Sequence, residues 1–289
     1  MNQQNFYYFL KDEKLAESSI QEHIKNIERF EKWAEQEGMT GTEQITYTEI
    51  LGFVQHLKSK SVGISSINNR LNSIRKYYEH LKAEGTIEAN PARRVHIKGN
   101  IKKVIHQPLS YTELEQLYQE YAKPKEHYRE EKGKKAHKRN TVILSLMIWQ
   151  AIHSGELNKI EISHVKLNEG VIYIPSTRRS NSREIKLESK QIILLHQYIS
   201  ENNFINEKLF DCHPANTMMY LVNELKGINQ VVKNAGHIRA SIILHWIKMY
   251  SKRQVQYMVG HKHISSTEHY EIQELTGLTD LLTKHHPFS

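Results

Sequence analysis

Residues 236–246 read G-H-I-R-A-S-I-I-L-H-W, and residues 255–270 read V-Q-Y-M-V-G-H-K-H-I-S-S-T-E-H-Y. The stretch contains Arg239, His261 and Tyr270 in that order, with nine residues from the histidine to the tyrosine. Each of these side chains alone is an ordinary packing or surface residue, because the chain has 15 tyrosines and 18 histidines. Their order and spacing together are far more specific.

The whole stretch resembles the C-terminal signature of the tyrosine recombinases, which is an H-x-x-R box, then L-G-H, then T-x-x-Y. The resemblance implies that the family's roles fall on the residues at the matching positions. These are the second catalytic arginine at Arg239, the glycine-histidine pair at Gly260 and His261, the threonine at Thr267 and the nucleophile at Tyr270.

The resemblance covers nearly the whole chain. Residues 65–91 look like the end of the family's N-terminal core-binding domain, and residues 148–162 look like the box around its first catalytic arginine. It implies a mainly α (α+β) fold, with an N-terminal helical, SAM-like domain and a C-terminal mixed catalytic domain carrying a small β-sheet or hairpin. It also implies a recombinase or integrase that works through a 3′-phosphotyrosine on Tyr270, without metal or cofactor.

A tyrosine nucleophile suits this reaction for a chemical reason. Rejoining a strand without an external energy source requires that the enzyme hold the cut end covalently, and a phenol can do so. The transition state gathers negative charge on the non-bridging phosphate oxygens, and a guanidinium grips two such oxygens at once. The leaving 5′-oxygen needs a proton, which the family supplies mainly from a lysine on a β-hairpin.

The first arginine of the family's pattern is missing here. The family's box reads T-G-L-R-x-x-E-L, whereas residues 150–157 read Q-A-I-H-S-G-E-L, so His153 stands at the arginine position. A histidine is charged only part of the time near neutral pH and does not grip two oxygens. Loss of one such donor costs about 3 kcal/mol of transition-state stabilisation.

The histidine of the H-x-x-R box is also missing, because Gly236 stands three residues before Arg239. Positions two apart on a helix do not share a face. His237 would therefore replace the histidine only if the backbone there still belongs to the loop before the helix.

The hairpin lysine is replaced as well. Alignment of residues 183–187 with the family's E-R-x-x-P-L strand puts Arg178 at the lysine position. Arginine is a poor proton donor because its pKa exceeds ~12. Two interpretations of Arg178 stay open, a phosphate-binding charge in the reaction or a clamp on the DNA backbone without chemistry. Lys186 is the nearby amine that can still donate a proton.

The charge balance favours a polyanionic partner. The chain carries 40 Lys and Arg against 32 Asp and Glu, which gives a formal net charge of +8. Such a surface attracts a phosphate backbone, and contacts with several phosphates make binding weaken as salt rises. The residues expected to contact DNA are Arg70, Arg75, Lys76, Lys102, Lys103, Arg179 and Arg183.

Hydrophobic periodicity divides the chain in two. It predicts amphipathic helices over residues 18–33, 47–57 and 65–81, after which Asn90-Pro91 breaks the helical pattern. The predicted organisation is an N-terminal helical DNA-binding domain over 1–98, a basic linker over 99–108 and a C-terminal catalytic domain over 109–289.

The second domain is predicted to be helical apart from one β-hairpin. Residues 171–175 alternate as a strand does, and residues 183–187 can return as its partner. The charged tract over 122–140 has two open interpretations, a solvated helix face or loop and a DNA-facing segment. The apolar run over 142–149 predicts a buried helix, since it is far short of the ~20 residues that cross a bilayer.

The single cysteine, Cys212, excludes an internal disulfide and favours a reducing compartment. We therefore expect a cytoplasmic protein, and the resemblance implies a bacterial one that is associated with DNA and not with a membrane. The expected partners are double-stranded DNA, further copies of the chain that assemble on it as a dimer to tetramer, and a second recombinase or accessory protein.

Two functions stay open, with a third behind them. The first is an active recombinase with a rearranged cationic set. The second is a catalytically impaired DNA-binding accessory or regulatory protein that retains the recombinase fold. The third is an unrelated basic helical regulator or RNA-binding protein, which would require the spacing of Arg239, His261 and Tyr270 to be accidental.

Overall fold

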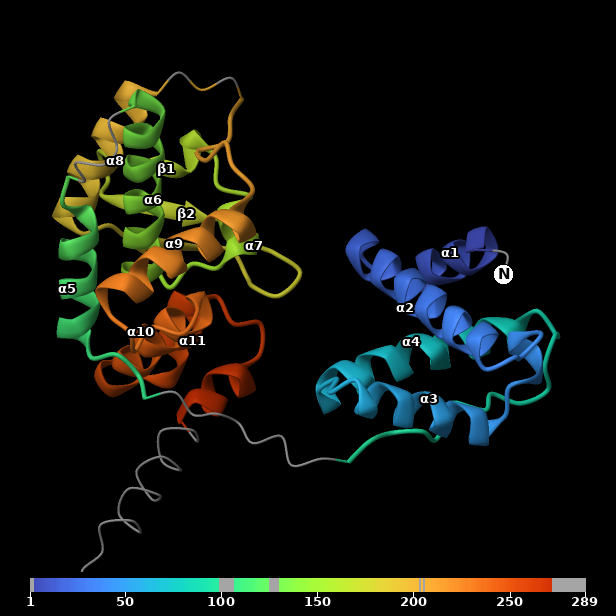
Figure 1. The fold of residues 1–289 in the computed structure, drawn as a ribbon. Coiled ribbons are helices and arrows are strands. Elements are labelled where there is room, and N and C mark those ends of the chain that lie inside the picture. Colours follow the sequence, from blue (N-terminus) through green and yellow to red (C-terminus); the bar gives the residue numbers. More distant parts are fainter. Residues whose placement is uncertain (1–2, 99–106, 125–129, 203, 205, 272–289) are drawn as a thin grey trace, which may run out of the picture. The chain divides into compact units, whose positions relative to one another are not determined.

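The computed structural model describes residues 3–98, 107–124, 130–202, 204 and 206–271. The chain forms two compact units, residues 1–103 and 104–289, and each is described by itself (Figure 1). The described part of the first unit is helical, and the second combines helices with a small sheet. The expected mainly α (α+β) fold is confirmed.

Helices with one apolar face build the first unit. Phe6, Leu10, Phe30 and Ile74 are fully buried, because three- and four-residue spacing turns them to the same side of their helices. The three predicted helices are present, and an N-terminal helix precedes them. The elements are α1 (Gln3–Asp12), α2 (Glu17–Gln36), the 3-10 helix η1 (Thr42–Gln44), α3 (Tyr47–Ser59) and α4 (Ile64–Ala83).

The second unit is organised around α6 (Glu131–Trp149), whose residues from Thr141 to Trp149 are all buried. A helix that is covered on several sides is apolar all round. The predicted buried helix over 142–149 is therefore confirmed. The helices that pack against α6 are α5 (Tyr111–Ala122), α8 (Ser189–Glu201), α9 (Pro214–Ile228) and α10 (Ala235–Met249), as Figure 1 shows.

The first half of α6 carries the charged tract. Lys132, Lys134 and Lys135 are exposed, and Lys138 pairs with Glu201 of α8 at 2.5 Å. Residues 131–140 of the tract are thus helical with exposed lysines, and contact of this face with DNA stays a prediction.

A three-stranded antiparallel sheet lies beside the helices. Its strands are β1 (Val165–Lys166), β2 (Val171–Ile174) and β3 (Arg183–Lys186), in that order. The register pairs Val171 with Lys186 and Ile174 with Arg183. The predicted hairpin is confirmed, and β1 adds a third strand that the sequence pattern did not predict.

The described second unit also contains the short helices α7 (Ser154–Leu157), η2 (Ile162–His164, a 3-10 helix) and α11 (Lys252–Val259). Residues 264–271 are helical as well. Within the described ranges, none of the helices combines the length and apolar character that crossing a membrane requires.

Candidate active site

Glu156 of α7 lies at the centre of a buried charged cluster. Its carboxylate is fully buried, and Oε2 accepts a hydrogen bond from the backbone N–H of His153 at 3.1 Å. In return, Nδ1 of His153 accepts the N–H of Gly155 at 3.1 Å, so the histidine caps α7. With Nδ1 as an acceptor, the proton of neutral His153 is on Nε2, which lies 3.5 Å from Glu156 Oε1.

Strand β3 brings Arg183 to the same carboxylate. Its Nη1 donates to Oε1 of Glu156 at 2.5 Å and its Nη2 donates to Oε2 at 3.2 Å, with both side chains fully buried. Burial by itself would raise the pKa of Glu156, but the hydrogen bond and charge of Arg183 hold that pKa below its ordinary value. Glu156 is therefore an anion in the folded protein.

Helix α10 brings Arg239 to the other side of Glu156. Its Nη1 lies 3.5 Å from Glu156 Oε2 and donates to the carbonyl of Ala151, while Nη2 donates to the carbonyl of Val259 at 3.1 Å. Burial lowers the pKa of Arg239, and the charge of Glu156 opposes that effect. The side chain is 14% exposed, whereas that of Arg183 is fully buried.

The end of α11 positions His261. The helix stops at Gly260 with a left-handed φ of 76°, and a Cβ there would lie 2.9 Å from the carbonyl oxygen of Asn181. Only glycine fits this turn without strain. Nδ1 of His261 lies 2.9 Å from Oγ1 of Thr267. The pKa of His261 is lowered to about 4, mainly by burial and also by the charges of two nearby arginines. The imidazole is therefore neutral at pH 7.

The phenol ring of Tyr270 stacks on His261. The ring centroids are 5.9 Å apart and the ring planes differ by 11°. Tyr270 lies in the helical residues 264–271, is half-buried against the core, and acts electrostatically on Arg239. The structure therefore brings Arg239, His261 and Tyr270 together.

The loop between β2 and β3 is tied to the same place. Ser180 pairs with His261 as an isolated β-bridge. The N–H of Thr177 donates to the carbonyl of Ser180 at 2.9 Å, and this turn leaves Arg178 and Arg179 exposed at the tip of the loop. Two cationic side chains thus stand beside the turn that carries His261.

Two models of known protein families match the chain. The model of the phage integrase N-terminal SAM-like domain matches residues 3–85, and the model of the phage integrase family matches residues 107–274. The chain belongs to the phage integrase family. The resemblance to tyrosine recombinases that the residues around Tyr270 carry is thereby confirmed.

Named relatives of this integrase family member align along almost its whole length. The tyrosine recombinase XerC of Bacillus subtilis (strain 168) is 23% identical over 304 residues, which cover 98% of this chain and 95% of the relative. XerC of Oceanobacillus iheyensis is 22% identical over 306 residues, which cover 98% and 94%.

Solved structures share the integrase fold. The XerH site-specific recombinase bound to palindromic difH substrate aligns with a TM-score of 0.72 at 15% identity, over 91% of this chain and 79% of that chain. The integrase of the transposon Tn1549 in complex with a circular intermediate DNA aligns with a TM-score of 0.66 at 14% identity, over 93% and 94%.

The integrase pattern T-G-L-R has a glycine where this chain has Ala151. The φ of Ala151 is 49°, in the left-handed region, where a residue with a Cβ is strained by about 1 kcal/mol or more. The carbonyl of Ala151 is an acceptor for Arg239. A strained residue therefore supports the arginine of the site.

The position that the H-x-x-R pattern gives to histidine is occupied by Gly236, which has no side chain. Gly236 is exposed. His237 already lies within α10, is 5% exposed, and its Nε2 is 2.9 Å from the carbonyl oxygen of Gln107. The condition under which His237 would replace the missing histidine is not met, because its backbone is helical.

The expectation that Arg183 contacts the DNA backbone is wrong for the protein as folded here. Arg183 is only 2% exposed, and its guanidinium is bound to Glu156. Strand register explains the difference, since Arg183 pairs directly opposite the buried Ile174 and so shares its inward face. Arg178 and Arg179 lie outside the paired strands, in the exposed loop.

Some of the residues of the first unit that are expected to contact DNA bind other residues of the same unit. Arg70 is half-exposed on α4. Arg75 donates to the carbonyl of Val95 at 3.1 Å, and Lys76 lies 2.5 Å from the carboxylate of Glu13. Lys102 and Lys103 lie outside the described residues.

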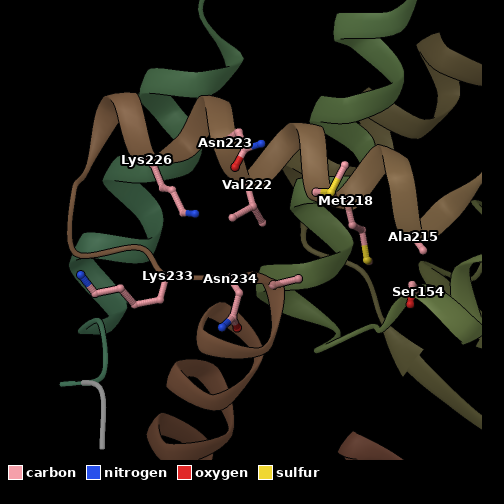
Figure 2. Close-up of a pocket in the computed structure, with 10 residues that line it drawn as sticks. Ser154, Ala215, Met218, Val222, Asn223, Lys226, Lys233 and Asn234 are labelled. Carbon is pink, nitrogen blue, oxygen red and sulfur yellow. The ribbon is translucent and has the colours of Figure 1, made fainter. Parts of the chain in front are cut away.

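A groove of about 300 Å³ runs between α9 and the start of α10 (Figure 2). Figure 2 shows Lys226 and Lys233 along one side of it and Ser154, the neighbour of His153, at the other end. No motif in the sequence marks these two lysines among the 40 lysines and arginines of the chain.

Lys159 is a further residue that sequence reasoning missed. Its Nζ donates to the carbonyl of Ser176 at 2.9 Å, in the β2–β3 loop just before Arg178. Lys186, the amine considered from the sequence, lies at the other end of β3 from Arg183, about 10 Å along the strand. Lys159 is therefore the amine that contacts the hairpin loop.

Proposed function

We propose that the chain is a site-specific DNA recombinase or integrase that cleaves and rejoins double-stranded DNA through a 3′-phosphotyrosine on Tyr270, without a metal ion. The observation that carries the proposal is the meeting of Arg239, His261 and Tyr270. It occurs in a member of the phage integrase family whose named relatives are tyrosine recombinases.

In the proposed step, the phenol oxygen of Tyr270 bonds to the scissile phosphorus while the bond from phosphorus to the 5′-oxygen breaks. A phenol is mostly protonated at neutral pH, so it must lose its proton as it attacks. The charge of Arg239 lowers the cost of the phenolate that forms, and the proton passes to solvent. Rejoining reverses the step, as the 5′-hydroxyl attacks the phosphotyrosine.

The charge of the cluster supports this reaction only in part. Arg183 and Arg239 carry positive charges and Glu156 a negative one, which leaves one positive charge in the buried cluster. Burial lowers the pKa of His153, with the charge of Glu156 opposing it, so His153 adds none at pH 7. We propose that Arg178, which is exposed, adds charge at the phosphate.

Lys159 is our proposed proton donor to the leaving 5′-oxygen. Its ammonium contacts the β2–β3 loop, on which the family carries its lysine. Arg178, which stands at that lysine's position, holds its proton too tightly for the task. Lys186 lies away from the loop tip, at the base of the hairpin.

The proposed DNA contacts involve both parts of the chain. We propose an N-terminal DNA-binding domain over residues 1–98, a linker over 99–108 and a catalytic domain over 109–289. Self-assembly on DNA as a dimer to tetramer and a second recombinase or accessory protein are the proposed protein partners. Limited proteolysis should release two folded fragments, and a single resistant core spanning residue 100 would contradict this division.

A second candidate function is a catalytically impaired DNA-binding accessory or regulatory protein. His153, Gly236 and Arg178 favour it, because each replaces a group that the family uses in catalysis. Retention of Tyr270 on His261 favours cleavage, since a protein that only binds DNA has no need of a phenol at this place.

A covalent trapping experiment separates the two candidates. The protein is incubated with a duplex of its own element's ends that carries a nick next to the cleavage position, so that the cut end diffuses away and the intermediate accumulates. We expect a covalent protein–DNA band with the wild type and none with Tyr270→Phe. No band with any nicked position, despite DNA binding, would leave only the binding role.

A further inference from the structure

Arg183, carried by β3, uses its whole guanidinium on two other segments of the second unit. Nη1 and Nη2 donate to the carboxylate of Glu156 on α7, and Nε donates to the carbonyl of Met258 near the end of α11 at 2.8 Å. Its own strand, β3, follows the loop that pairs with His261. The side chain is fully buried, so none of these contacts is shared with solvent.

Two arginines share Glu156 unequally. The distances to Arg183 are 2.5 and 3.2 Å, in a two-pronged geometry, whereas Arg239 lies 3.5 Å away and directs hydrogen bonds at two backbone carbonyls. The stronger pair neutralises the carboxylate. Without Arg183, a fully buried anion would be left beside Arg239, and the two would form the close pair instead.

We infer that Arg183 is a positioning residue, which neutralises Glu156 so that the charge of Arg239 is left for the scissile phosphate, and which fixes the turn that carries His261. The second part follows from its bond to Met258, two residues before Gly260. Arg183 touches no DNA in this assignment. The inference rests on the proposed function.

The inference is tested by removing the charge of Arg183 first alone and then together with the charge of Glu156. Arg183→Met alone is expected to slow covalent complex formation about a hundredfold, because the buried Glu156 captures Arg239. Arg183→Met together with Glu156→Gln removes both charges of the pair. The double variant is expected to recover about tenfold over Arg183→Met, since nothing then competes for Arg239. A double variant no faster than the single one would overturn the inference.

DNA affinity is measured on the same proteins. Arg183→Met is expected to leave both the affinity and its salt dependence unchanged. The matched control is Arg179→Met on the same hairpin, which removes an exposed charge and should lower the salt slope by about 1. If Arg183→Met lowered the slope as Arg179→Met does, Arg183 would be a DNA contact and the inference would fail.

Arg183→Lys covers the case in which Arg183→Met does not fold. A lysine keeps the charge but cannot bind both oxygens of Glu156 and the carbonyl of Met258 at once. We expect slower cleavage at unchanged DNA affinity. Cleavage equal to wild type would show that the two-pronged contact is unnecessary.

A histidine titration tests the inference without cleavage. The charge of Arg183 is one cause of the low pKa of His261, so Arg183→Met should raise that pKa, followed by NMR of the imidazole with His261→Asn as the assignment control. An unchanged titration would contradict the inference. Wild-type protein that forms no covalent complex would instead remove the proposed function, while the titration still shows whether the charge of Arg183 acts on His261.

Discussion

The ring of Tyr270 lies parallel to the ring of His261, with 5.9 Å between their centroids and 11° between their planes. His261 is itself held by Thr267 at 2.9 Å and by the β-bridge to Ser180. The phenol ring is therefore placed by a neighbour that is fixed from two sides. The placement depends on the ring and not on the hydroxyl.

Replacement of Tyr270 by phenylalanine should accordingly keep the site intact and remove only the nucleophile. We expect Tyr270→Phe to abolish the covalent DNA complex, because no other group at this place forms the ester. DNA binding should stay within a few tenths of a kcal/mol, since one hydroxyl contributes little to an interface of many phosphate contacts. Gel analysis of trapped complexes and a binding titration measure the two quantities. A covalent complex that persists in the variant would remove Tyr270 from the mechanism.

The sequence predicts those site residues that can be recognised from their spacing within one short stretch. Arg239, His261 and Tyr270 lie in one stretch of the sequence, and helices joined by short turns bring them together. The need for Gly260 could be anticipated from the family pattern, and the left-handed φ of 76° supplies its physical reason. Patterns of this kind can be recognised in a sequence because each depends on only a few neighbouring residues.

Contacts that depend on strand register were not predictable in the same way. Arg183 looked like its exposed neighbours in a basic hairpin, yet its pairing opposite Ile174 turns it inward to Glu156. Side chains of successive strand residues point to opposite faces, so a shift of one residue would have exposed it. Lys159 was missed for a related reason, because its contact with Ser176 joins segments that no local motif connects.

Stability should fall in mild acid because His261 is neutral in the folded protein. Its pKa is lowered from the ordinary 6.5 to about 4 by burial and by the charges of Arg239 and Arg183. Above pH 6.5 both folded and unfolded chains hold a neutral imidazole, and below it the unfolded chain binds the proton first. Stability should therefore drop between pH 6.5 and 4. The full shift corresponds to about 3 kcal/mol, and the drop from this partly buried residue should be smaller because solvent screens it.

Urea unfolding at a series of pH values measures that drop, with His261→Asn as the control. Asparagine keeps a group that can hydrogen-bond Thr267 but does not titrate. The fall between pH 6.5 and 4 should be smaller in the variant. An equal fall in both proteins would show that other groups cause the acid sensitivity.

Ala151→Gly should stabilise the protein, because Ala151 has a φ of 49° and glycine adopts this conformation freely. Alanine at a left-handed position costs more than the entropy it saves in the unfolded chain. The loss of a fully buried methyl group opposes the gain, so we expect a net increase of up to about 1 kcal/mol. Thermal unfolding of the two proteins checks this, and a lower midpoint for the glycine variant would show that the methyl contact outweighs the strain.

His153→Arg should raise the rate of DNA cleavage. The imidazole is neutral at pH 7, since burial lowers the pKa of His153, and it lies 3.5 Å from Glu156 within the charged cluster. A guanidinium at this position would add a permanent charge and a two-pronged donor beside Arg239, where the developing charge of the phosphate is expected. We expect the rate of covalent complex formation to rise about tenfold to a hundredfold.

The same change should lower stability, which makes a second variant necessary. Nδ1 of His153 accepts the N–H of Gly155 and caps α7, and an arginine offers no acceptor, so the loss costs about 1 kcal/mol. His153→Asn keeps a capping oxygen without adding charge. Under the proposed mechanism only the arginine variant gains in rate, although it is the less stable of the two. If both variants cleave at the wild-type rate while remaining folded, the missing arginine does not limit the reaction, and the charge at Arg239 and Arg178 suffices.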